Sequence, residues 1–310
     1  MEGCLMKKWR VPGFLGVFAL ISAGCCLWKE HSSTIDSLPI VNRILDVCNL
    51  SEVESLKELA EVVDSWKLSS EERFSREILP VCQLKDEHAF YNDFSLLRMT
   101  QAVPAYAATY DCAVVFGGPL PALRQRLDFL IREWQRGVRF QKIIFLCGKR
   151  SLYPMLEAKE HFFDSRYNPF PSEANWEQDA SQGMPSSEEE VAKFIWAQML
   201  LPKAWRDSNV KVVFLVADPS EGEHATRKDT LKLLSSYYVE FPERVLFVSS
   251  QPFINLDRCR LEQVFKEGNY DISGPGFAQG ILKYPWASRV CLHTLAVWLE
   301  ETHGHLRVCK

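Results

Sequence analysis

The feature that most constrains the fold is a series of short apolar runs that alternate with amphipathic stretches after Ala102. The apolar runs indicate strands at 111–116, 142–147, 210–217, 244–250 and 270–273, and the stretches between and after them predict helices at 120–136, 187–201, 226–240, 256–267 and 286–302. Continuous Val, Ile, Leu and Phe strands separated by helices are typical of a parallel sheet that is covered on both faces. The sequence therefore predicts an α/β fold with a doubly wound, mainly parallel five-stranded sheet, which is a Rossmann-like architecture.

The preceding part of the chain has a helical pattern from about residue 33 to residue 101, with no strand candidate. The segments Ser51 to Glu54 and Ser69 to Glu72 have the spacing of capping boxes, in which a Ser side chain and a Glu side chain close the start of a helix. We place Leu56, Leu59, Val62 and Val63 on one face of the first helix. This region is predicted to be a helical appendage, 33–101, to the Rossmann-like domain, 102–302.

One interval inside the α/β part is too long for an ordinary connection. Residues 151–185, rich in Pro, Asn, Ser and aromatic side chains, follow the second strand. Loops of this length are uncommon, and they often form a lid or a wall of a binding site. We therefore expect this excursion to contribute to a site.

The first 26 residues have the layout of an export signal. Three basic residues, Lys7, Lys8 and Arg10, precede an uncharged apolar run from Val11 to Ala23, which is shorter than the roughly 20 residues that span a bilayer. The run ends in Ser22-Ala-Gly-Cys25, which resembles a bacterial lipobox except for Ser22, where Leu is usual. We expect a protein of the cell envelope that is membrane-anchored through its N-terminus and faces the periplasm, with Cys25 as the lipidated residue. An uncleaved signal anchor and ordinary secretion stay open as alternatives.

Charge and cysteine content limit the classes of partner. The net charge of −4 over 310 residues argues against nucleic acid, because binding phosphates along a strand needs a basic face. The ten cysteines contain no C-x-x-C pair, and their spacing to histidines fits no zinc site, so we predict no metal. An exported protein can hold disulfide bonds, but the spacing does not determine which cysteines pair.

The residues that follow the predicted strands are the candidate site, because ligands of open α/β sheets bind beyond the carboxyl ends of the strands. Glycines permit tight turns and close approach, and arginines and hydroxyls bind phosphate or carboxylate groups. The candidate ligand-binding residues are Gly117, Gly118, Arg126, Gly148, Arg227, Thr230, Ser250, Gln251 and Arg258. They predict a small anionic ligand, whereas the simpler alternative is that these positions are turn residues, helix caps and solvated arginines.

Known motifs do not identify a cofactor or a reaction. No G-x-G-x-x-G follows the first strand, the sequence around Gly148 is no P-loop, and no G-x-S-x-G is present; the cofactor is therefore unknown. Glu188 and Asp229 are the candidate catalytic carboxylates, as acid or base. Both also stand where a helix is predicted to begin, so a capping role is the alternative for each.

The order of the motifs resembles a bacterial envelope family of uncharacterised domains, the YdcF/SanA/ElyC-like family. The shared elements are VVFGGP at 114–119, R-x-R-L from Arg124, a strand that ends in CGK at 147–149, Ser187-Glu188, Arg227-Lys-Asp229-Thr230 and VLFVSSQ at 245–251. The resemblance covers about residues 110–276, and it implies a membrane-held Rossmann-like domain with a role in envelope biogenesis and a nucleotide-type ligand. Many relatives carry a histidine soon after the fourth strand, but here that stretch is Gln251-Pro-Phe-Ile254.

Two functions follow from these observations. The first is an envelope-associated protein that binds a nucleotide-like, sugar-phosphate-like or lipid-phosphate-like ligand, with hydrolysis or group transfer left open. The second is a non-catalytic lipoprotein that acts through protein partners, which the absent histidine and the added helices favour.

Overall fold

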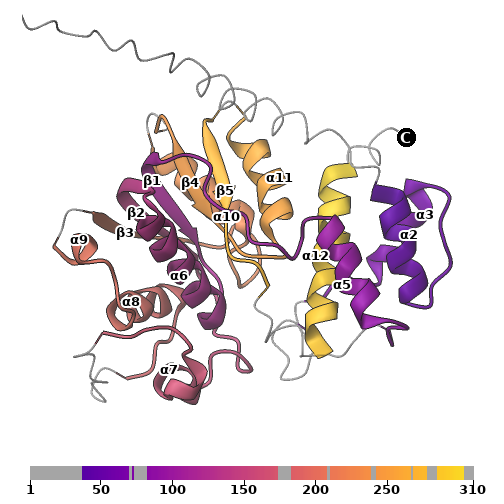
Figure 1. The fold of residues 1–310 in the computed structure, drawn as a ribbon, viewed down its shortest axis with the longest axis horizontal. Helices are drawn as coiled ribbons and strands as arrows, with labels where there is room; N and C mark the ends of the chain where they lie inside the picture. The colour runs from indigo at the N-terminus through magenta and orange to yellow at the C-terminus, as the bar shows by residue number, and fades with distance from the viewer. Residues whose placement is uncertain are drawn as a thin grey trace, which may run out of the picture.

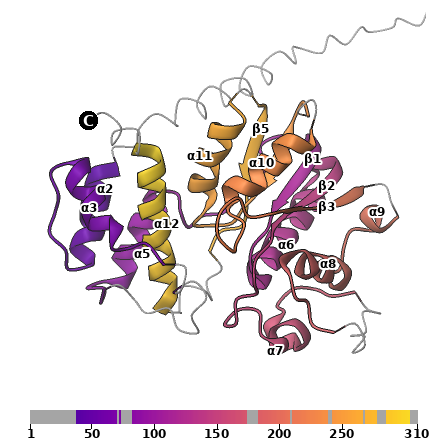
Figure 2. The ribbon, with the colours of Figure 1, turned by 180° about the vertical axis from the view of Figure 1, so that it is seen from behind.

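The computed structural model describes residues 37–69, 72, 82–173, 183–207, 210–238, 242–266, 268–277 and 285–303. The proposed export signal, with Cys25, lies outside these residues. The described chain forms an α/β part and a helical part that lie side by side (Figure 1), and the view from behind shows the same arrangement (Figure 2). Within the described ranges, no helix is both long enough and apolar enough to cross a membrane.

The sheet confirms the predicted fold class. It contains β1 (Thr109–Phe116), β2 (Arg139–Gly148), β3 (Lys211–Ala217), β4 (Val245–Val248) and β5 (Tyr270–Ser273). The strands pair in the order β3-β2-β1-β4-β5, and every pair is parallel. After β3 the chain crosses to the other side of β1, so the switch point at which ligands bind in such sheets lies between β1 and β4.

Helices cover the two faces of the sheet, as the continuous apolar strands require. One face packs against α6 (Leu120–Arg136) and α8 (Glu188–Gln198), and the other packs against α10 (Arg227–Tyr237) and α11 (Ile254–Val264). Neighbouring strand residues alternate between these cores: Val115 belongs to the first, and Val114 and Phe116 belong to the second. Helix α6 ends at Gly137, whose φ of 111° is a left-handed conformation that glycine adopts without strain.

The described helices of the helical part are α2 (Ser37–Val47), α3 (Leu56–Asp64), α5 (Glu87–Leu96) and the C-terminal helix α12 (Pro285–His303). Its core joins both ends of the described chain, because Ile44, Phe90 and Phe94 pack in one buried cluster with Leu292 and Leu295 of α12. The last helix therefore completes the core of the N-terminal helices, and Figure 1 shows it between α2 and α3 on one side and the α/β part on the other.

The structure corrects one predicted helix start and confirms the other. Helix α3 begins after Ser55, whose hydroxyl accepts from the N–H of Glu58 at 3.2 Å, so the box predicted at Ser51 to Glu54 is wrong. The physical reason is that Asn42 bonds both the N–H and the carbonyl of Val53, at 3.1 and 3.0 Å, and holds that segment outside the helix. The box at Ser69 and Glu72 is confirmed by its two reciprocal bonds, at 2.7 and 3.1 Å.

The excursion after β2 contains α7 (Lys159–Phe163) and the 3-10 turn η1 (Ser165–Tyr167), followed by α8 and by the short α9 (Lys203–Arg206). Arg124 of α6 holds it in place. This guanidinium is 1% exposed and donates to the carbonyls of His161 and Tyr167, at 2.9 and 3.2 Å, and to the side chain of Gln198 of α8, at 2.8 Å. The described portion of the excursion is thus packed against α6 and α8.

Candidate functional site

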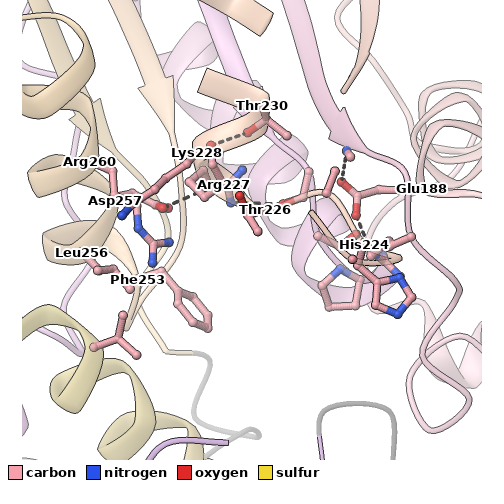
Figure 3. Close-up of a pocket in the computed structure, with 18 of the residues that line it drawn as sticks. Glu188, His224, Thr226, Arg227, Lys228, Thr230, Phe253, Leu256, Asp257 and Arg260 are labelled. Carbon is pink, nitrogen blue, oxygen red and sulfur yellow. Dashed lines mark hydrogen bonds and ion pairs between the residues drawn. The ribbon is translucent and has the colours of Figure 1, made fainter. Parts of the chain in front are cut away.

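A cavity of about 690 Å³ lies beyond the carboxyl ends of β1 and β2 and extends to α12. The starts of α10 and α11 form its middle, and the close-up shows Phe253 and Leu256 across the cavity from Glu188 and His224, with Arg227 between them (Figure 3). The predicted site residues that line it are Gly117, Gly118, Arg126, Gly148, Glu188, Arg227 and Thr230. The cavity thus stands at the edge of the sheet that the topology assigns to ligands.

Arg126 lies under the first turn after β1. Its side chain reaches back from α6 and donates to the carbonyls of Phe116 and Gly117, at 2.8 and 2.6 Å, and to the hydroxyl of Ser250, at 3.0 Å. It forms no ion pair with any described residue, and its buried Nε has no hydrogen-bond partner among them. Burial and the positive charge of Arg227 lower the pKa of Arg126 to about 10, against the opposing effect of the carboxylates of Asp257 and Glu188. A buried cation next to a second cation is a place that an anion would stabilise.

Arg227, the first residue of α10, is the second cation at the switch point. Its Nε donates to Asp257 at 3.1 Å, and its guanidinium lies 4.0 Å over the ring of Phe116. Asp257 is 2% exposed and also accepts a 2.6 Å bond from the hydroxyl of Ser249. Arg227 and Arg126 both donate to the carbonyl of Gly117, so that two guanidinium groups and one carboxylate meet at the end of β1.

A buried network of one arginine and two glutamates forms the opposite wall. Arg150 forms an ion pair with Glu188 and a bidentate one with Glu157, at 2.8 and 3.0 Å. Glu188 also accepts from the N–H of Gly148 at 3.2 Å, and Glu157 accepts from the N–H of Leu120, at the start of α6, at 3.0 Å. The two carboxylates raise the pKa of Arg150 against the opposing effect of burial. The candidate catalytic residue Glu188 therefore lines the cavity while it is held by Arg150.

Two glycines permit the close approach of these groups. A Cβ added to Gly117 would lie 1.7 Å from Oε1 of Glu188, and one added to Gly118 would lie 2.9 Å from Nη1 of Arg126. Any larger side chain would therefore displace a charged group of the site. The packing of charged groups at the cavity therefore requires glycine at both positions after β1, in addition to the requirement of the turn itself.

The other candidate catalytic residue, Asp229, is part of a helix cap. Its carboxylate accepts from the N–H and the hydroxyl of Thr226, at 2.7 and 2.8 Å, and from the hydroxyl of Ser220 at 2.5 Å. With the bond from the Asp229 N–H to the Thr226 hydroxyl, these contacts complete a capping box at the start of α10. Thr230 bonds the carbonyl of Arg227 at 2.9 Å. The capping alternative for Asp229 thus describes its contacts, and its side chain does not line the cavity.

Three predicted ligand residues lie away from the lining. Ser250 stands behind Arg126, as its hydrogen-bond acceptor. Gln251 is buried and donates to the carbonyls of Arg98 and Gln101, at 2.9 and 2.8 Å, which ties the segment before β1 to the end of β4. Arg258 is on α11 but not in the lining, where Arg260 of the same helix is found instead. The two arginines are about half a helical turn apart, so they face in different directions.

The sequence does not reveal the residues whose role depends on distant partners. Arg150 is not among the predicted site residues, although it lies two residues after Gly148, because Glu157 in the excursion and Glu188 on α8 give it its place in the site. His293 and Val297 reach the cavity from α12, and Nδ1 of His293 accepts a 3.0 Å bond from the N–H of Leu68 in the helical part. No local motif marks these positions.

Within the described residues, no three His, Cys, Asp or Glu side chains are grouped so that they could hold a metal ion. No family model, no curated protein and no solved structure matches this chain.

Proposed function

We propose that the cavity binds a small anionic ligand, of the phosphate-ester type, at the switch point between β1 and β4. The observation that carries this proposal is the buried guanidinium of Arg126, which forms no ion pair with any described residue and lies beside Arg227. A bound oxyanion above Gly117 would offset both positive charges.

The start of α10 supports the same position for the anion. The first turn of a helix has N–H groups without partners inside the helix, and its dipole favours negative charge. Thr226, Arg227 and Lys228 of this turn all line the cavity. Lys228 is exposed and forms no ion pair with the described residues, so its ammonium group is available to a ligand.

A thermal-shift titration tests the proposal. The probes are inorganic phosphate, nucleotides, sugar phosphates and a short polyprenyl phosphate, each offered to the wild-type protein. A ligand present at about 100 times its Kd should raise the Tm by about 5 °C. The shift should shrink strongly in Lys228→Ala and Arg227→Ala. It should persist in Arg132→Ala, a matched control that removes an exposed arginine of α6 paired with Asp128 on the surface.

Two results would contradict the proposal. One is the absence of a shift with every anionic probe. The other is an equal shift in the wild type and in both cavity variants, because the anion would then bind elsewhere. The alternative of a non-catalytic protein that acts through partners would gain from the first result.

The location of the protein is a separate part of the proposal. The basic residues, apolar run and Cys25 of the first 26 residues support export to the cell envelope, where the resemblance to the envelope family also places it. Mass spectrometry of the mature N-terminus distinguishes the alternatives. A diacylglyceryl group on Cys25 is the expected result, an intact Met1 would indicate a signal anchor, and cleavage without lipid would indicate secretion.

A further inference from the structure

Two cysteines from separate segments meet in the helical part. Cys48 directly follows α2 and is 2% exposed, and Cys82 is partly buried against the same apolar core. The two thiol groups lie close enough for each to shift the pKa of the other. Both are free thiols in the structure. The question is therefore whether this contact can become a covalent bond without disturbing the fold.

Three links join the residues around Cys48 to the residues that directly follow Cys82. The N–H of Lys85 donates to the carbonyl of Val47 at 2.9 Å, and the side chain of Asn49 donates to the carbonyl of Gln83 at 3.0 Å. An ion pair between Lys85 and Asp46 adds a third link, at 2.7 Å. These links lie on both sides of Cys48 and directly after Cys82, so the two segments stay side by side, which is the condition for a disulfide of ordinary geometry.

The surroundings give the two sulfurs different roles. The neighbouring Cys48 thiol and the positive charge of Arg289 lower the pKa of the Cys82 thiol, against the opposing effect of burial. The neighbouring Cys82 thiol and burial raise the pKa of Cys48. A thiolate is the nucleophile in disulfide exchange, so Cys82 is the sulfur suited to attack and Cys48 the one suited to complete the exchange.

We propose that Cys48 and Cys82 are a disulfide pair, formed by exchange with a small disulfide oxidant. The Cys82 thiolate attacks one sulfur of the oxidant, breaks its S–S bond and forms a mixed disulfide, and the second sulfur leaves as a thiolate. The Cys48 sulfur, after losing its proton, then attacks the Cys82 sulfur and releases the other half of the oxidant. The two cysteines are oxidised, the oxidant is reduced to two thiols, and the two cysteine protons end on those thiols.

The other described cysteines lack this combination. Cys291 shares the same core, but it is fully buried in α12 and burial raises its pKa. Cys112 and Cys147 are buried in β1 and β2, and burial raises the pKa of both thiols. Cys259 is partly exposed on α11, and it serves as the matched control.

The experiment uses the purified full-length protein with oxidised glutathione. After incubation, free thiols are blocked with N-ethylmaleimide, and the protein is digested without reduction and analysed by mass spectrometry. We expect a peptide pair linked through Cys48 and Cys82. We also expect a Tm about 5–10 °C above that of the reduced protein, since the bond closes a loop of about 35 residues. The reductant TCEP should reverse both effects.

Variants separate this pair from other thiols. In Cys82→Ser the linked peptide and the Tm increase should be lost, and in Cys259→Ser both should remain. In the wild type, without any substitution, N-ethylmaleimide should modify Cys82 faster than Cys259 at pH 7. Three findings would overturn the proposal: full alkylation of both cysteines after oxidation, a link from either cysteine to Cys291 instead, or a Tm increase that persists in Cys82→Ser. None of these readouts depends on the ligand proposed for the cavity.

Discussion

Gly117→Ala tests how closely the glycine turn and the buried charges of the site depend on each other. The added Cβ would lie 1.7 Å from Oε1 and 2.8 Å from Cδ of Glu188, and 2.9 Å from the carbonyl oxygen of Leu146. Contacts below 3.0 Å are essentially never seen for a Cβ, so the carboxylate must move by more than 1 Å. The substitution is therefore expected to expel Glu188 from its present place.

The energetic cost follows from the bonds that Glu188 would lose. The buried N–H of Gly148 would lose its acceptor, which costs about 1–3 kcal/mol. Breaking a buried ion pair costs about 3–5 kcal/mol, but Arg150 would keep its bidentate contact with Glu157. We therefore expect the free energy of unfolding to fall by about 2–4 kcal/mol in Gly117→Ala.

Urea unfolding of a double-mutant cycle isolates this effect. Glu188→Ala removes the side chain that the added Cβ would meet and leaves the 2.9 Å approach to the carbonyl oxygen of Leu146, so Gly117→Ala should cost much less in that background than in the wild type. Gly222→Ala is the control, because no heavy atom lies within 4 Å of its added Cβ and its cost comes from its φ of 70° alone. Equal costs of Gly117→Ala in the two backgrounds, within about 0.5 kcal/mol, would refute the reasoning.

Two further substitutions separate stability from ligand binding. Asp229→Ala removes a helix cap and should lower the free energy of unfolding by about 1 kcal/mol at pH 7, while leaving the ligand-induced Tm shift intact. Burial raises the pKa of Asp229, but hydrogen bonds from Ser220 and Thr226 outweigh it and lower the pKa below its usual range. The stabilisation is therefore present above the unfolded pKa and is lost as the pH falls through the folded pKa. Urea unfolding should therefore show a smaller difference between variant and wild type at pH 3 than at pH 7. Gln251→Ala leaves two backbone carbonyls without their donor and should lower the free energy of unfolding by about 1–3 kcal/mol. Hydrogen exchange should show faster opening of the segment before β1 in this variant. Unchanged exchange there would contradict the role of Gln251 in holding that segment to the end of β4.

The architecture could be predicted from the sequence because its signals are local. The strands β1 to β4 contain continuous apolar runs, and the helix between two such runs has one apolar face, so periodicity alone indicates a parallel sheet with helices on both sides. The same local signals can indicate the wrong start for a helix. Ser51 and Ser55 are each followed three residues later by Glu, and only the distant bonds from Asn42 to Val53 decide which serine caps the helix.

The candidate site was predictable to the extent that it follows strand ends. Gly117, Gly118 and Arg227 are found at the cavity because the topology brings the carboxyl ends of the strands together. The contribution of α12 could not be predicted in this way, because it depends on packing between the two ends of the chain. The same holds for Glu157, whose buried carboxylate comes from an irregular excursion.

The count of charges in the cavity lining does not show where a ligand would bind, but the way they pair does. Arg150 is shared by two buried carboxylates, so that wall has an excess of negative charge. Arg227 has one carboxylate, from Asp257, and Arg126 forms no ion pair with the described residues. The buried excess of positive charge therefore lies at the end of β1, whereas the exposed Lys228 at the start of α10 shares the cavity lining with the exposed carboxylates of Glu221 and Glu223. An anion is accordingly expected on the α10 side of Gly117, and whatever it carries can extend from there toward the apolar side chains of α11 and α12.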